Sequence, residues 1–184
     1  MSKTINEGFL RFHFDERWIV IKYDDHKDYR ERIGRLPDTK AVDFAAIHDV
    51  VFLFFIEVKD FRGYRIQNRH RVLDGEPAVE VAQKVRDSVA GIVAAHHRGS
   101  TKVWDQFIAC LTSSENPVRV LLWLEDDLPP GPRGRRPNQA SVLIDRLKQH
   151  LRWLTPRVMV AGLTVGAAPE GLTVSSLPGA GLSA

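Results

Sequence analysis

The most apolar stretch of the chain is Val50–Ile56 (VVFLFFI), which is followed directly by a charged segment that contains Glu57 and Lys59. As a helix this run would cover about 10 Å, far less than the ~30 Å interior of a bilayer. β-Branched and aromatic side chains dominate it, which favours a buried β-strand. We therefore expect the chain to fold around this strand, with charged groups emerging where it leaves the core.

A second strand is expected immediately before this run. Ala41–His48 (AVDFAAIH) is largely apolar, and only a short connection separates it from the apolar run. Such a connection predicts an antiparallel hairpin. If the hairpin folds about Val50, Asp43 stands directly opposite Glu57, with Cβ atoms about 5 Å apart.

The alternation of side chains along a strand places Glu57 and Lys59 on one face, beside Asp43. Facing carboxylates repel each other unless a cation lies between them or one of them is protonated. Mg²⁺ and Mn²⁺ prefer oxygen ligands, which Asp43, Glu57 and the carbonyl of Val58 could supply. Lys59 could orient or deprotonate a water molecule, and the metal could activate that water and neutralise a phosphodiester. The constellation predicts metal-dependent phosphodiester hydrolysis.

Asp43 and the Glu57-Val58-Lys59 segment resemble the PD-(D/E)xK nuclease superfamily, which includes restriction endonucleases, Holliday-junction resolvases and recombination exonucleases. The resemblance covers residues 15–125 and implies that Asp43 and Glu57 bind Mg²⁺ or Mn²⁺ while Lys59 assists attack. It also implies an α/β (α+β) fold: a restriction endonuclease-like mixed β-sheet core flanked by helices, in the order α-β-β-β-α-β. An extra helix and strand follow at the C-terminal side.

The sequence departs from the superfamily pattern in two places. Val42 stands where the motif has proline, and Gln83 is followed four residues later by Asp87, whereas some members have Gln and Tyr at this spacing on the second helix. Some members also use a further acidic ligand from the first helix. Four candidates for that ligand stay open: Glu7, Glu16, Asp24 and Asp25.

The rest of the chain predicts one nuclease-like domain over residues 1–184. Further strands are expected at Trp18–Tyr23, Arg119–Glu125 and Arg157–Ala161, and helices at Asp28–Ile33, Pro77–Arg98, Thr101–Leu111 and Asn138–Leu154. Phe9–Phe14 (FLRFHF) is compatible with a strand or the end of a short helix. Residues 129–138 are expected to form a basic Pro/Gly-rich surface loop, and residues 162–184 a Gly/Ser/Pro-rich tail.

The net charge of +3 permits a polyanionic partner without requiring one. Seven basic residues are candidates for nucleic-acid contacts: Arg62, Arg65, Lys84, Arg86, Arg133, Arg135 and Arg136. DNA is favoured over RNA as the partner and endonuclease over exonuclease as the activity, and cutting both strands would suit a homodimer. Two alternatives stay open: a non-catalytic nucleic-acid-binding module of the same fold, or an interaction protein whose carboxylates are incidental.

The remaining features bear on cellular location and on other classes of enzyme. The first residues, MSKTINEGFLRFHF, lack the pattern of a signal peptide, and the only cysteine, Cys110, lies in an apolar segment. We expect a cytoplasmic protein without a membrane segment, in which Cys110 is a buried hydrophobic residue. No P-loop, dinucleotide fingerprint or Gly-x-Ser-x-Gly turn is present.

Overall fold

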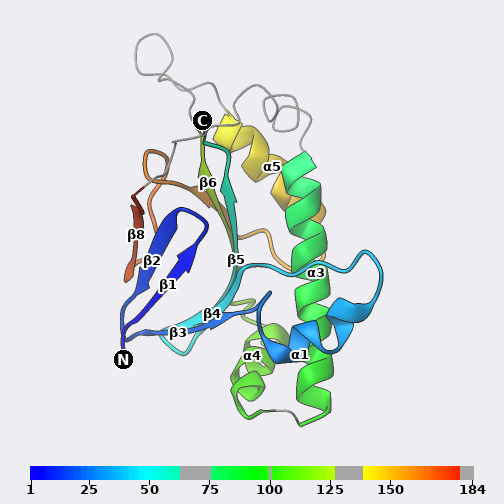
Figure 1. Cartoon of the computed structure of the whole chain (residues 1–184). Helices are drawn as coiled ribbons and strands as arrows, with labels where there is room; N and C mark the ends of the chain where they lie inside the picture. Colours follow the sequence, from blue (N-terminus) through cyan, green and yellow to red (C-terminus); the bar gives the residue numbers. More distant parts are fainter. Residues whose placement is uncertain (63–75, 100, 127–138, 179–184) are drawn as a thin grey trace.

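A computed structural model describes residues 1–62, 76–99, 101–126 and 139–178. Figure 1 shows its mixed α+β architecture, which confirms the predicted fold class at this coarse level. The elements are β1 (Lys3–Glu7), β2 (Leu10–Phe14), β3 (Trp18–Lys22), α1 (Lys27–Arg30), η1 (Ile33–Arg35), β4 (Phe44–His48), β5 (Phe52–Asp60), α3 (Glu76–His97), α4 (Val103–Thr112), β6 (Val118–Glu125), α5 (Gln139–Leu151), β7 (Val158–Ala161) and β8 (Leu172–Ser176).

The larger sheet has five strands in the order β3-β4-β5-β6-β7. β3, β4 and β5 are antiparallel neighbours, whereas β5, β6 and β7 run parallel. The β4–β5 hairpin pairs Phe44 with Ile56 and His48 with Phe52, which is the predicted register about Val50. β5, the apolar run that the sequence singled out, is therefore the central strand, with a neighbour on each side.

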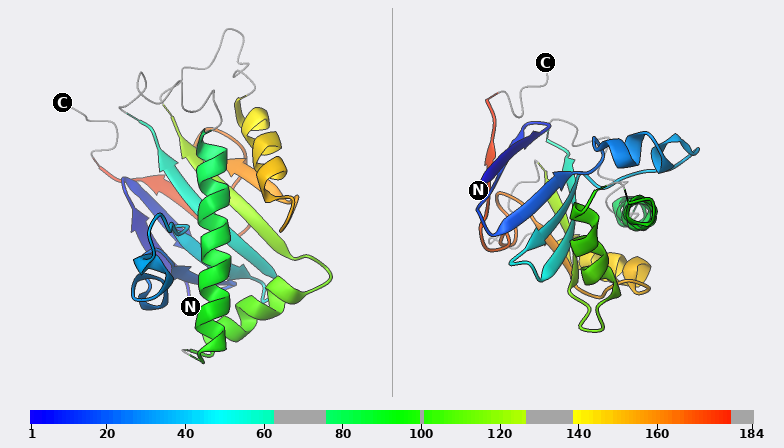
Figure 2. Two further views of the ribbon diagram at one scale, coloured as in Figure 1. Left: turned by 90° about the vertical axis from the view of Figure 1, so that its right-hand side faces the viewer. Right: turned by 90° about the horizontal axis from the view of Figure 1, so that it is seen from below.

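Helices cover one face of this sheet and the second sheet covers the other, as the right-hand view in Figure 2 shows. Leu53 and Phe55 of β5 pack toward the helices, where Val81, Val85 and Ile92 of α3 are fully buried. The three α3 residues belong to the stripe predicted from helical spacing. The structure therefore has three layers, and side chains on the odd-numbered positions of β5 face the helices.

The opposite layer is the three-stranded sheet β1-β2-β8. The resemblance implied a helix before the first strand of the core, and Phe9–Phe14 was compatible with a strand or the end of a short helix. The chain forms the strands β1 and β2 there. The reason is the period-two pattern of β2, in which Leu10, Phe12 and Phe14 are fully buried and alternate with exposed residues. These three side chains cover the even-numbered face of the larger sheet, where Phe44 and Ile56 lie.

The C-terminal segment is the second departure from expectation. Residues 162–184 were predicted as a tail, but Leu172–Ser176 forms β8, which pairs antiparallel with β2. Leu172 is buried opposite Phe14, so its burial and the hydrogen bonds of the ladder hold this segment in place. The basic loop expected at residues 129–138 lies outside the described residues. Within the described part of the chain, no helix has the length and apolar character needed to cross a membrane.

Candidate functional site

The predicted motif lies at the end of β5, beneath α3. Glu57 and Lys59 continue the odd-numbered face of β5, which the helices cover. Asp43 directly precedes β4, and extending the hairpin register by one residue places it opposite Glu57. The chain turns away from the core here, so three charged side chains gather at the border of an apolar layer.

Asp43 is almost completely buried, with 7% of its surface exposed. Its Oδ2 accepts a hydrogen bond of 2.7 Å from the backbone N–H of Val58, and its Oδ1 lies 3.9 Å from Nζ of Lys22. Burial, together with the negative charge of Glu57, raises the pKa of the Asp43 carboxyl to about 7. Burial and the charge of Glu57 therefore both favour the protonated form of the Asp43 carboxyl.

Glu57 is the most deeply buried acid of the site, with 1% exposure. Its Oε1 lies 2.6 Å from Nζ of Lys84 and 3.2 Å from Nζ of Lys59, and its buried Oε2 has no hydrogen-bond partner among the described residues. Burial raises the pKa of Glu57, although the two ammonium groups oppose this shift. Facing carboxylates repel each other unless a cation lies between them or one of them is protonated. Here the ammonium groups of Lys59 and Lys84 supply part of the positive charge.

The helix residues that reach the site are Glu80 and Lys84, which lie four positions apart on one face of α3. Nζ of Lys59 is 2.8 Å from Oε1 of Glu80, and Lys84 contacts Glu57 as described above. Gln83 is exposed, and Asp87 accepts a hydrogen bond from the backbone N–H of Lys40. Gln83 and Asp87, which have the spacing of the Gln/Tyr pair found in some superfamily members, therefore do not face the motif. The α3 residues that face it are Glu80 and Lys84.

A second group of acids meets Asp43 from β1 and from the segment that follows β3. Oxygens of Glu7, Asp24 and Asp43 all lie within 4.8 Å of one another. Nζ of Lys22 contacts Glu7 and lies 2.8 Å from Asp24. Of the four candidates for a further acidic ligand, Glu7 and Asp24 therefore adjoin the motif. The other two, Glu16 and Asp25, do not belong to this group.

The network as a whole carries more negative than positive groups. Its carboxylates are Glu7, Asp24, Asp43, Glu57 and Glu80, and its ammonium groups are Lys22, Lys59 and Lys84. If all were ionised, an excess of two negative charges would remain, which a divalent cation can match. The described carboxylates whose oxygens lie close enough to share such an ion are Glu7, Asp24 and Asp43. The ligands predicted from the sequence are Asp43, Glu57 and the carbonyl of Val58, and Glu57 does not belong to this group of three.

Three of the seven predicted nucleic-acid contacts lie within the described residues. Lys84 lies inside the charge network. Arg62 donates to Oδ1 and Oδ2 of Asp60 and to Oγ of Ser176, so its guanidinium is directed toward β8. Arg86 is exposed and pairs with Asp87. The remaining candidates, Arg65, Arg133, Arg135 and Arg136, lie outside the described residues.

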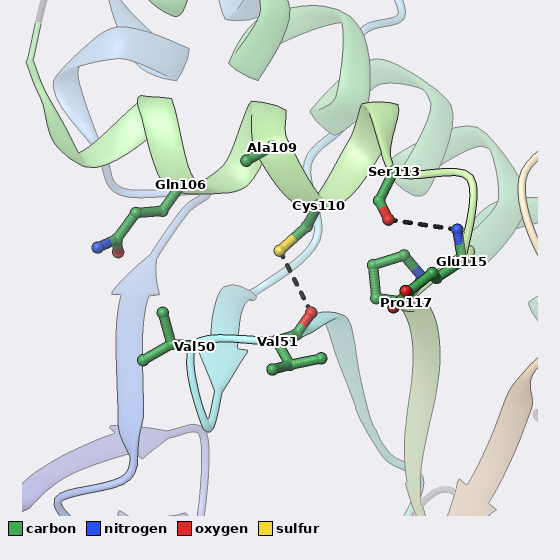
Figure 3. A pocket seen from close by; sticks show the side chains of 8 residues that line it. All are labelled: Val50, Val51, Gln106, Ala109, Cys110, Ser113, Glu115 and Pro117. Atoms are coloured by element: carbon green, nitrogen blue, oxygen red, sulfur yellow. Dashed lines mark hydrogen bonds between the residues drawn. The ribbon is translucent and has the colours of Figure 1, made fainter.

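Figure 3 shows a pocket at the other end of β5, between the β4–β5 turn and α4. It is lined by Val50, Val51, Gln106, Ala109, Cys110, Ser113, Glu115 and Pro117. Sγ of Cys110 lies 3.4 Å from the carbonyl oxygen of Val51, and burial raises the pKa of this thiol. Six residues of extended chain separate Val51 from Glu57, or about 20 Å, so the pocket is separate from the charge network.

Comparison with known proteins adds little to this geometry. The chain matches no protein-family model and no solved structure. It is 26% identical over 148 residues to a cysteine–tRNA ligase of Neisseria meningitidis serogroup A, serotype 4A, in a match that covers 66% of this chain. The match covers 21% of that protein, so the chain spans about a fifth of the length of this curated relative. A likeness of this extent does not place the chain in a family.

Proposed function

We propose that this chain is a metal-dependent nuclease that hydrolyses phosphodiester bonds, with a restriction endonuclease-like core. The observation that carries the proposal is the pairing of two buried carboxylates, Asp43 and Glu57, beside Lys59 at the end of the central strand. Oε2 of Glu57 is buried without a hydrogen-bond partner in the described structure. Such an oxygen is costly to bury unless a further cation or donor binds it.

The chemistry follows from the types of residue present. Mg²⁺ or Mn²⁺ bound by Asp43 and Glu57 would activate a water molecule and neutralise charge on the phosphodiester. Lys59 lies beside Glu57, so its ammonium is placed to stabilise developing charge or to orient the attacking water. The carbonyl of Val58, whose N–H donates to Asp43, would supply a further oxygen ligand. DNA is the favoured substrate, cut internally.

The fold supports this assignment through the placement of the motif. The order hairpin, long helix and parallel strand, formed by β4–β5, α3 and β6, is the one that the PD-(D/E)xK resemblance implies. The parallel pairing of β5 with β6 requires a crossover, and α3 belongs to it, so the helix passes over the end of β5. In this arrangement Lys84 of α3 contacts Glu57, one of the two acids of the motif.

The experiment is a cleavage assay on duplex DNA, single-stranded DNA and RNA, with Mg²⁺, Mn²⁺ or EDTA. Wild type should cleave only with metal, and Mn²⁺ should raise its melting temperature. Glu57→Gln should lose both effects, whereas Lys59→Ala should lose most of its cleavage activity and keep the metal-induced stabilisation. Glu125→Gln is the matched control, because Glu125 is also a buried carboxylate but is bound by Trp123 and the N–H of Leu163.

A purely structural charge network is the competing explanation. The ion pairs of Glu57 with Lys84 and Lys59 would then serve stability alone. In that case wild type would cleave none of the three substrates and would melt at the same temperature with and without metal. Salt-dependent DNA binding without cleavage would instead favour the non-catalytic binding module.

A further inference from the structure

The ammonium of Lys59 is held between two carboxylates from different elements. It lies 2.8 Å from Oε1 of Glu80 on α3 and 3.2 Å from Oε1 of Glu57 on its own strand. The Glu80 contact is the shorter one and is also a hydrogen bond donated by Nζ. The side chain of Lys59 is 16% exposed, so most of it is fixed by its surroundings.

Glu57 alone is a poor anchor for Lys59. Its Oε1 is shared, because Lys84 contacts the same oxygen at the shorter distance of 2.6 Å. A lysine has a flexible four-carbon stem, and its ammonium takes the position that its partners dictate. A carboxylate that also binds a metal would have less negative charge left for Lys59. A second carboxylate, beyond the motif itself, is therefore needed to keep the ammonium in place.

We propose that Glu80 is a positioning residue that holds the Lys59 ammonium beside Glu57. The inference rests on the proposed function for its effect on catalysis, but the contact can be tested separately. Burial acts to raise the pKa of Glu80, yet the charges and hydrogen bond of the nearby lysines bring its pKa below the ordinary value. Glu80 is thus ionised at neutral pH, as an anchor for an ammonium must be.

Removing the anchor should reduce turnover and spare metal binding. Glu80→Ala should lower kcat by about 10- to 100-fold, the usual effect of losing a group that orients a reactive residue. Glu80→Gln should recover part of this loss, because its amide oxygen can still accept from Nζ. The rise in melting temperature with Mn²⁺ should persist in both variants. Gln83→Ala, an exposed position on the same helix, is the control and should behave as wild type.

A double-mutant cycle distinguishes positioning from a general loss of structure. If Glu80 acts through Lys59, Lys59→Ala and Lys59→Ala/Glu80→Ala should have the same residual kcat. A further loss in the double variant would overturn the proposal, as would full activity of Glu80→Ala.

Chemical labelling tests the contact without any nuclease activity. The acetylation rate of Lys59, followed by mass spectrometry, should rise several-fold in Glu80→Ala, rise less in Glu80→Gln and stay unchanged in Gln83→Ala. An unchanged rate in Glu80→Ala would overturn the proposal. If wild type cleaves nothing but the labelling rates change as expected, the proposed function fails, while Glu80 is still shown to hold Lys59.

Discussion

Asp43 is the residue whose ionisation should respond most clearly to its surroundings. Its carboxyl is buried against Glu57, and its pKa rises from an ordinary 3.8 to about 7. A raised pKa in the folded state means that folding favours the protonated carboxyl. The contribution of Asp43 to stability is therefore fully present below about pH 4 and is lost as the pH rises through about 7.

Replacing Asp43 by Asn should remove this pH dependence. Between about pH 5 and pH 8, without metal, the melting temperature of wild type should fall more than that of Asp43→Asn. The amide oxygen of Asn can still accept the hydrogen bond from Val58, so the local structure is retained. Thermal melts at several pH values measure this, with Asp25→Asn, at an exposed acid, as the control. If the melting temperature changes equally with pH in wild type and in Asp43→Asn, the argument from burial is contradicted.

At this scale, strand parity and hairpin position were sufficient to predict the register that pairs Phe44 with Ile56, which places Asp43 opposite Glu57 when it is extended by one residue. They could not identify Glu80, and Lys84 was predicted only as a nucleic-acid contact and not as a partner of Glu57, since helical spacing shows which residues share a face but not where that face meets the sheet. Contacts between elements depend on how the elements pack in the folded chain, and local sequence patterns do not contain that information.

The β4–β5 hairpin illustrates how an element can form with an unfavourable turn. Asp49 and Val50 have φ angles of 51° and 61°, and the N–H of Val51 donates to the carbonyl of His48, as in a type I′ turn. A β-branched residue is strained in this conformation. The hairpin forms in spite of this, because burial of the apolar faces of β4 and β5 outweighs the cost of the turn.

Val50→Gly should therefore stabilise the protein. Relief of the left-handed strain is worth about 1–2 kcal/mol, and the greater freedom of glycine in the unfolded chain offsets about 0.4–1 kcal/mol of it. Val50 is 69% exposed, so little burial is lost. Urea unfolding should show a net gain of about 0.5–1 kcal/mol. Val51→Gly, which lacks the positive φ, should destabilise instead, and a loss of stability in Val50→Gly would refute the argument.

The main elements were predictable because their apolar residues recur at periods of two or near four. β8 was not, because Leu172–Ser176 is short and polar on one side, and it becomes a strand only by pairing with β2. The same pairing explains the second sheet. β2 carries the buried side chains of Leu10, Phe12 and Phe14, and pairing with β1 and β8 satisfies the backbone groups along both of its edges.

For the whole molecule, the charge network lies at the edge where β5 and β6 end. Two basic segments leave the described structure from this edge, one after Arg62 and the other after Asp126. The second contains Arg133, Arg135 and Arg136, which were predicted to contact nucleic acid. The last described residue before this segment, Asp126, directly follows β6, and Glu125 of β6 pairs with Asp60 of β5.

The triple variant Arg133→Ala/Arg135→Ala/Arg136→Ala should weaken DNA binding uniformly across sequences and reduce its salt dependence. Every phosphate that the variant no longer neutralises should lower the slope of log K against log salt concentration by about one unit. Fluorescence anisotropy between about 50 and 200 mM salt measures this slope. The control is Arg98→Ala/Lys102→Ala, because these exposed residues flank the junction of α3 and α4, far along α3 from Glu80. If the control lowers the slope per removed charge as much as the triple variant does, the basic loop has no special role, and binding reflects net charge alone.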